Sequence, residues 1–213
     1  MINICGGESL KQIIQKRYNQ ECISFGEAMI DGNLPTMQYD AFCVERAKCH
    51  DVDIEEYKKH MQDFFDCVNG HLLDDITLWF GKDCFCMINL LTVLAILENK
   101  QYKRMVDLNI VDERSGEMIT STHVLLGQFT NVYDSLKDKQ YVCTNNQYLD
   151  KAIQAYLNLY DDNGEIATFI KHSKLDGDKL FQEIMKNNDL GLSDVVAMKV
   201  IKRYRKDAKN IKK

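Results

Sequence analysis

The stretch DITLWFGKDCFCMINLLTVLAIL, residues 75–97, joins a short apolar run to a longer and almost wholly apolar segment. In its first six residues the apolar side chains alternate with Thr77 and Trp79, which predicts a strand over residues 75–80. Gly-Lys-Asp then gives a tight turn, and residues 85–97 are so apolar that they indicate a helix buried on most sides. A buried strand followed directly by a buried helix is typical of a parallel sheet covered by crossover helices.

The segments on either side continue this alternation of strand and helix. Apolar runs predict further strands at residues 2–5, 22–25 and 104–111, and helical spacing predicts helices at residues 10–17 and 53–69. Short turns connect these segments, which favours right-handed crossovers. We therefore expect residues 1–113 to form an α/β domain with a Rossmann-like, open and mostly parallel sheet.

From about residue 115 the strand signal is lost and helical spacing takes its place. Apolar residues recur at intervals of 4, 3 and 4 over residues 125–136 and 149–160, and shorter helical segments follow at residues 166–170, 175–185 and 195–204. Residues 189–193 (DLGLS) indicate a break and a new N-cap before the last segment. We expect residues 114–213 to be an all-helical C-terminal region with a basic final helix, packed on the sheet domain.

Composition limits the class of protein. The chain has 213 residues and a single proline, Pro35, and its hydrophobic fraction of 45% excludes a disordered chain. No apolar run reaches the roughly 18 residues of a membrane helix, and the N-terminus lacks a basic start followed by an apolar stretch. We expect a cytoplasmic protein that does not bind membranes.

Charge is divided unevenly along the chain. Residues 199–213 carry eight Lys and Arg against Asp207, or +7, so the net charge of −5 leaves −12 for residues 1–198. An acidic body argues against broad nucleic-acid binding, because phosphate requires a basic surface. The basic tail has two interpretations, contact with nucleic acid or an acidic partner and, more simply, a solvated helix end.

The eight cysteines are expected to be reduced thiols, because the chain is long enough to form a core without disulfides. The spacings Cys43-x5-Cys49 and Cys84-x-Cys86 differ from the usual zinc-binding spacings, so we expect no metal site. Cys84 and Cys86 lie near a predicted helix N-terminus, where exposure would lower their thiol pKa values.

Polar residues follow the ends of three predicted strands. Ligands bind beyond the carboxyl ends of the strands in open parallel sheets. Gly7, Glu8 and Ser9 follow the first strand at a helix start, where unpaired N–H groups attract anions, although a tight turn with Ser9 as N-cap explains them equally well. Glu27 follows the second strand, in a loop over residues 26–36, and Asp83 follows the third, where an N-cap role is the alternative.

These residues converge on one predicted rim of the sheet. We predict Glu27 and Asp83 as catalytic carboxylates, since clustered carboxylates serve as acid and base. Arg46 is predicted to bind an anionic ligand or to pair with a carboxylate, and Asn89 lies in the helix that follows Asp83. The predicted ligand-binding set is therefore Gly7, Glu8, Ser9, Arg46 and Asn89.

Three segments resemble a known family. Residues 78–85 (LWFGKDCF), with Asn89 and a Leu-Leu pair after them, resemble its Leu-Trp-Phe-x-His-Asp-Leu-Phe/Tyr segment. Residues 2–10 (INICGGESL) resemble its opening strand and Gly-Asp-Ser, and residues 24–33 (SFGEAMIDGN) resemble its Trp-Arg-Glu/Asp-x-Leu-x-x-Gly-Pro segment, after which it also has an arginine. The family is the uncharacterised bacterial family called domain of unknown function eighteen-thirty-five.

The resemblance is strong over residues 1–98 and weak afterwards, where residues 119–122 resemble a helix start and residues 191–193 the start of a last helix. It implies the same rim residues and no substrate. Two departures matter: Lys82 stands where the family has histidine, and Cys84 where it has leucine. If that histidine is catalytic in relatives, the chemistry of this chain is altered or lost.

Three functions stay open. The first is a ligand-binding or enzymatic α/β protein whose polar rim takes a small anionic or nucleotide-like ligand. The second is a transcription-related DNA-binding protein that uses residues 175–185 and 195–204 as a helix pair. The third is a non-catalytic interaction or assembly protein with Tyr148, Tyr156 and Tyr160 as a contact patch. No motif identifies a cofactor, and the sequence does not fix the oligomeric state.

Overall fold

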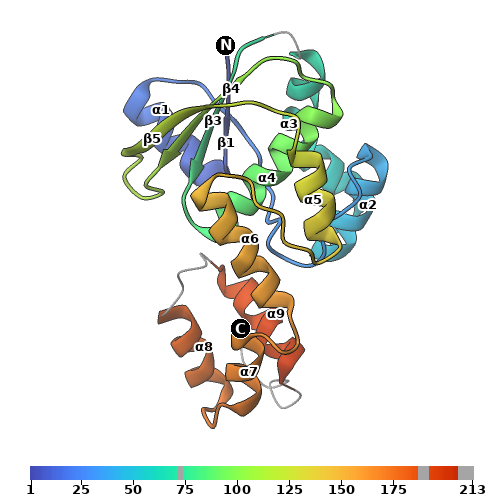
Figure 1. Cartoon of the computed structure of the whole chain (residues 1–213), viewed down its shortest axis with the longest axis vertical. Helices are drawn as coiled ribbons and strands as arrows, with labels where there is room; N and C mark the ends of the chain where they lie inside the picture. Colours follow the sequence, from blue (N-terminus) through green and yellow to red (C-terminus); the bar gives the residue numbers. More distant parts are fainter. Residues whose placement is uncertain (72–73, 187–191, 206–213) are drawn as a thin grey trace.

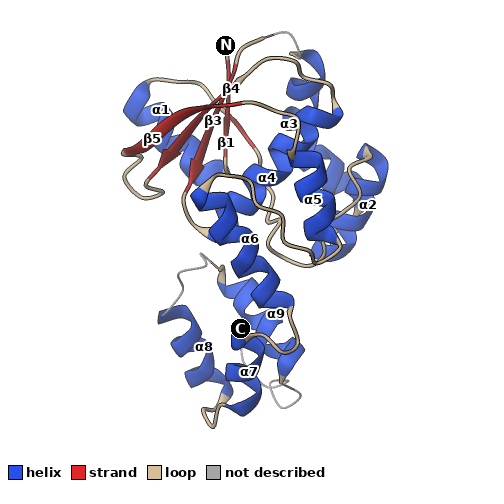
Figure 2. Ribbon diagram, in the orientation of Figure 1, coloured by secondary structure: helices blue, strands red, loops and turns tan. Residues whose placement is uncertain are grey.

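The computed structural model describes residues 1–71, 74–186 and 192–205. Five strands of this part form one sheet in the order β2-β1-β3-β4-β5 (Figure 2). The strands β1 (Ile2–Cys5), β2 (Ile23–Ser24), β3 (Ile76–Gly81) and β4 (Val106–Val111) are parallel, and β5 (Met118–Val124) is antiparallel to β4. This mostly parallel sheet, with helices between its strands and further helices at the C-terminal end, confirms the predicted fold class.

Helices cover both faces of the sheet. Figure 1 shows α1 (Glu8–Tyr18) on one side and α3 (Ile54–Gly70) and α4 (Cys84–Asn99) on the other. The alternation within β3 follows this division, because Trp79 packs with the residues of α1 whereas Leu78 and Phe80 belong to the large core on the opposite face. Trp79 is therefore a core residue on the α1 face of the sheet.

The central helix α4 joins the sheet to the C-terminal helices. Thirteen of its sixteen residues are buried, as its apolar composition predicts. Asp83 is its N-cap and accepts a hydrogen bond from the backbone N–H of Cys86 at 2.7 Å. The helix packs against α5 (Phe129–Lys137) and α6 (Gln147–Tyr160), so the helical region shares one continuous core with the sheet.

The expectation of an all-helical chain after about residue 115 is wrong at β5. Residues 119–122, which resemble a helix start, instead pair with β4, with Thr122 opposite Leu108 and Thr120 opposite Ile110. The residues of β5 are exposed or half-buried on both faces, so neither helical nor strand periodicity marks them. Backbone pairing holds this strand, and the sheet extends beyond residue 113.

The last three described helices are α7 (Glu165–His172), α8 (Gly177–Lys186) and α9 (Asp194–Tyr204). Of these, α7 packs against α6, and α9 packs against both α7 and α8 (Figure 1). Ser193 is the N-cap of α9, as predicted, and accepts from the N–H of Val196 at 3.3 Å. Most of the predicted break at residues 189–193 and most of the basic tail, residues 206–213, lie outside the described residues. In the part described, no helix is both long and apolar enough to span a membrane.

Candidate functional site

An open pocket of about 660 Å³ lies at the carboxyl ends of β1, β2 and β3. Five of the seven predicted site residues line it: Gly7, Glu8, Ser9, Glu27 and Asp83. The parallel order β2-β1-β3 places the segment that follows each strand at the same edge of the sheet, which is why residues so distant in sequence meet. The pocket therefore coincides with the predicted rim.

The carboxylate of Glu27 is the most heavily bonded group of the pocket. Its Oε1 accepts from the N–H of Ala28 at 2.6 Å, from Arg46 at 2.9 Å and from Nε2 of His50 at 2.7 Å, and its Oε2 accepts from the hydroxyl of Tyr57. The Glu27 side chain is only 1% exposed. Burial alone would raise its pKa, but the bonds from His50, Arg46 and Tyr57 and the charge of Arg46 hold the pKa well below its usual range.

Arg46 lies beneath the pocket on α2 (Tyr39–His50) and is fully buried. Besides Glu27, its guanidinium donates to the carbonyl oxygens of Asp31 at 2.7 Å and Ala28 at 2.9 Å. Its Nε has no partner among the described residues. Arg46 therefore pairs with a carboxylate, as one of its two predicted roles requires, and its side chain does not line the pocket.

The bonds around Glu27 fix the tautomer of His50. An ionised carboxylate only accepts hydrogen bonds, so Nε2 of His50 carries the hydrogen that points to Glu27. A nitrogen of Arg46 lies 3.1 Å from Nε2 of His50 but already donates to Glu27 and Ala28. Both nitrogens of this close pair therefore carry hydrogens, and no hydrogen bond joins them. Nδ1 of neutral His50 then has a free lone pair, and no described residue forms a hydrogen bond with it.

The half-buried imidazole of His50 lines the pocket and lies nearly parallel to the ring of Tyr57, with 6.3 Å between ring centroids. Tyr57 is buried, and burial first and Glu27 second raise the pKa of its hydroxyl, so Tyr57 stays a proton donor to Glu27. The fully bonded Glu27 thus orients His50, and His50 is the member of the cluster with a nitrogen available to a ligand.

Asn89 holds the loop that carries Glu27. Its Oδ1 accepts from the N–H of Met29 at 2.9 Å, and its Nδ2 donates to the carbonyl oxygen of Glu27. The side chain is completely buried within α4 and does not line the pocket. Asn89 and Arg46 therefore position the 27–31 loop from its buried side.

The N-terminus of α1 opens into the same pocket without a side-chain cap. Gly7 is the N-cap, with φ of 104°, and no side chain accepts from the first turn. The alternative that Ser9 caps this helix is wrong, because the helix begins at Glu8 and Ser9 lies within its first turn. The backbone N–H groups of Glu8, Ser9 and Leu10 have no acceptor within the described residues, which leaves them to an anion.

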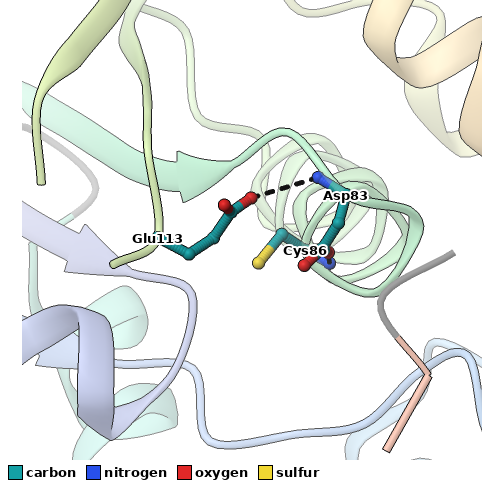
Figure 3. A group of neighbouring side chains, drawn as sticks. All are labelled: Asp83, Cys86 and Glu113. Atoms are coloured by element: carbon teal, nitrogen blue, oxygen red, sulfur yellow. Dashed lines mark hydrogen bonds between the residues drawn. The ribbon is translucent and has the colours of Figure 1, made fainter. Parts of the chain in front are cut away.

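The three side chains of Asp83, Cys86 and Glu113 meet at the N-terminus of α4, with ligand atoms within 4.8 Å of one another (Figure 3). Glu113 reaches across from the segment after β4 and accepts from the N–H of Lys82 at 2.7 Å and of Asp83 at 3.2 Å. A Cβ at Gly81 would collide with Glu113, so this approach requires glycine. Asp83 caps α4 and Glu113 accepts from the turn that leads into it, which explains the group without a metal ion.

Burial decides the chemistry of the cysteines. All eight are free thiols, and Cys84 and Cys86 are buried. Burial raises the pKa of Cys84 to about 12 and that of Cys86 well above its usual value, with the charge of Asp83 adding to both. The exposure that would have lowered these pKa values is absent, so neither is an activated nucleophile.

The structure does not support the sites predicted for the two other functions, the tyrosine patch and the basic final helix. The exposed tyrosine patch is wrong: Tyr156 is fully buried, Tyr148 and Tyr160 are half-buried, and the hydroxyls of Tyr156 and Tyr160 donate to the carbonyl oxygens of Gly32 and Ile30. On α9, Lys199 pairs with Asp31 at 2.6 Å and Arg203 with Asp162 at 3.6 Å. These described cations of the final helix are engaged within the chain.

Sequence reasoning missed His50, Tyr57 and Glu113. His50 follows Arg46 by four residues, so a helix through this segment would have placed both on one face. Tyr57 lies within the predicted helix over residues 53–69, and helical spacing alone does not show where its hydroxyl points. Glu113 reaches the site because β4 ends beside β3, which no local pattern shows.

No family model matches the chain, and neither does any curated protein or solved structure. The resemblance to the uncharacterised bacterial family therefore stays a prediction.

Proposed function

We propose that the pocket binds a small anionic or nucleotide-like ligand and that His50 accepts a proton from it. The observation that carries this proposal is the bond of 2.7 Å between Nε2 of His50 and the buried, ionised carboxylate of Glu27. A carboxylate in this position fixes the orientation of an imidazole and stabilises the imidazolium that forms when the ring takes a proton. Glu27 is then a positioning residue, and His50 is the catalytic base.

The anionic group of the ligand lies against the N-terminus of α1 in this proposal. The first-turn N–H groups and the positive end of the helix dipole both favour an anion there. The negative charge of Glu8 would repel an anionic group, but two partners reduce this repulsion. Oε2 of Glu8 accepts from the hydroxyl of Ser24 at 3.0 Å and lies 3.6 Å from Nζ of Lys11. Its charge is thereby partly balanced at the edge of the pocket.

A second carboxylate of the pocket lining supplies an acid. Asp83 faces the pocket from the N-terminus of α4, and burial, followed by the charge of Glu113, raises its pKa. A raised pKa favours the protonated form that a general acid requires. Asp83 is therefore the proposed proton donor and His50 the acceptor, while Leu10, Val52 and Phe85 add apolar lining to the same pocket.

A matched pair of variants tests the anion site. Ser9→Asp places a carboxylate in the first turn of α1, where it suits the helix dipole and competes with an anionic ligand, whereas Ser9→Asn has nearly the same shape and no charge. The wild type and both variants are screened by thermal shift against inorganic phosphate, nucleoside monophosphates and sugar phosphates. We expect at least one compound to stabilise the wild type and Ser9→Asn, and its affinity for Ser9→Asp to fall by about tenfold or more. Stabilisation of all three proteins alike would overturn this placement, and stabilisation of none would overturn the proposed ligand class.

A further inference from the structure

The strand β5 forms the outer edge of the sheet. It is the last strand in the order β2-β1-β3-β4-β5, and Figure 2 shows it at one side of the sheet. Each edge strand presents a row of backbone N–H and C=O groups that no neighbouring strand satisfies. Seven residues is long for such a strand, since the opposite edge, β2, has only two.

The sequence of β5 lacks the usual protection of an exposed edge. Natural edge strands carry Lys, Pro or inward-pointing charges, which prevent pairing with another chain. Residues 118–124 read MITSTHV and contain no Lys, Arg, Asp, Glu or Pro. The one titratable side chain, His123, bonds to Asp107 on β4 at 2.6 Å and is directed toward its own sheet.

Exposed apolar side chains gather at both ends of this edge. Ten large hydrophobic residues are exposed among those described, and four of them lie here: Met105, Met118, Ile119 and Leu125, at 57%, 37%, 41% and 73%. The pairing of Val106 with Val124 brings Met105 and Leu125 to one end, while Met118 and Ile119 lie at the other. Such a concentration is typical of a surface that another molecule covers.

We propose that a second copy of this chain pairs with β5 in antiparallel orientation around a two-fold axis at Ser121. Around this centre Thr120 lies opposite Thr122 of the second copy, and Met118 lies opposite Val124. Thr–Thr pairs and apolar pairs stabilise neighbouring strands, and no charged residue meets a like charge across the axis. The two five-stranded sheets then form one sheet of ten strands, and the unsatisfied backbone groups of both edges are paired.

A second copy suits this edge better than a strand of another protein. An antiparallel pair of identical strands satisfies the rule that both partners use the same patch in a two-fold dimer. The acidic remainder of the chain, at −12 over residues 1–198, disfavours contact between copies elsewhere, so the uncharged edge is the place where two copies approach at least electrostatic cost. This inference does not depend on the proposed ligand.

Charge substitution at the two-fold centre tests the dimer. Ser121 is exposed, so Ser121→Lys and Ser121→Glu leave the fold intact and place two like charges next to each other in a homodimer. Sedimentation velocity should show the wild type as a dimer of two 24.7 kDa chains and each variant as a monomer. An equimolar mixture of the two variants should restore the dimer, because Lys then faces Glu.

Asn131→Lys, on the exposed side of α5, is the control for added charge and should stay dimeric. Three results would overturn the proposal: a wild type that is monomeric at its highest soluble concentration, a dimer that persists in both Ser121 variants, or variants that do not recombine when mixed. Circular dichroism of each variant confirms that the sheet is formed, so loss of the dimer is not loss of the fold.

Discussion

Nε2 of His50 lies 2.7 Å from Oε1 of Glu27, and the same oxygen accepts from Arg46 at 2.9 Å. One buried oxygen thus holds both the guanidinium that fixes the loop and the imidazole that faces the pocket. The arrangement makes Glu27 the residue on which the shape of the site depends.

Glu27→Gln should destabilise the protein strongly. An amide keeps the shape of the side chain but leaves the fully buried charge of Arg46 without its carboxylate. We expect the free energy of unfolding to fall by about 3 kcal/mol or more, as for other buried ion pairs that lose one partner. Urea denaturation measures this change. The control Glu117→Gln, at an exposed position, should change the stability by less than about 0.5 kcal/mol.

The same carboxylate predicts how stability depends on pH. The pKa of Glu27 in the folded protein lies well below its ordinary value of 4.5, so the ionised form favours folding. The contribution of Glu27 is therefore complete above about pH 4.5 and is lost as the pH falls further. Acid unfolding of the wild type and Glu27→Gln, followed by circular dichroism, should give curves that converge at low pH. A constant difference between them would contradict the assignment.

Replacement of Glu98 should cause a second, independent loss of folding stability. Its carboxylate accepts from the backbone N–H groups of Gln128, Phe129 and Thr130 at 2.8 to 2.9 Å and so caps α5 from the end of α4. Burial raises the pKa of Glu98, but the backbone N–H groups of Thr130, Gly127 and Phe129 outweigh burial, so the net pKa is lowered. Glu98→Ala should cost about 1–2 kcal/mol in thermal or urea unfolding. Glu98→Gln, which keeps an acceptor oxygen, should cost less, and an equal cost for both would argue against the cap.

Lys199 should couple the last helix to the loop of the site. Its Nζ lies 2.6 Å from the carboxylate of Asp31, which is buried, and the carbonyl oxygen of Asp31 accepts from Arg46. Lys199→Met and Asp31→Asn should each destabilise the protein, and the double variant should lose less than the sum, with a coupling of about 1–3 kcal/mol. Strict additivity in urea unfolding would show that the pair contributes nothing.

Thiol reactivity should follow burial rather than helix position. Cys143 is exposed, whereas Cys84 and Cys86 are buried with raised pKa values. A thiol reagent such as dithionitrobenzoate should label Cys143 rapidly, and Cys143→Ser should remove that rapid phase. Cys84 and Cys86 should react only on unfolding. Their labelling in the native protein, located by mass spectrometry, would be inconsistent with the buried positions.

Periodicity predicted the elements that bury a regular face. The predicted strand at residues 75–80 and helix at residues 53–69 each lie within one residue of β3 (Ile76–Gly81) and α3 (Ile54–Gly70). The helix α2 was not predicted, because its buried face carries Arg46 among apolar residues and therefore shows little amphipathic pattern. Arg46, which anchors the loop of the site, thus weakens the sequence pattern by which α2 could have been predicted.

The candidate site was predictable where it depends on strand ends and not where it depends on tertiary contacts. Gly7, Ser9 and Asp83 line the pocket because the parallel topology places them there. The sequence predicts Glu27 as a catalytic carboxylate, whereas the structure makes it the residue that orients His50. This difference was not predictable, because it follows from donors on α2 and α3 that surround the carboxylate. The strand β5 was not predicted, because both of its faces are largely exposed and its sequence shows no alternation of apolar and polar residues.

The tautomer of His50 tests the central claim most directly. Long-range ¹H–¹⁵N correlation spectra of the wild type, recorded where the imidazole is neutral and assigned with His50→Gln, distinguish a protonated from an unprotonated ring nitrogen. We predict that Nε2 is protonated and Nδ1 unprotonated, and that Glu27→Gln changes this pattern. A proton on Nδ1 with Nε2 bare would contradict the proposal that Glu27 orients His50 as a proton acceptor.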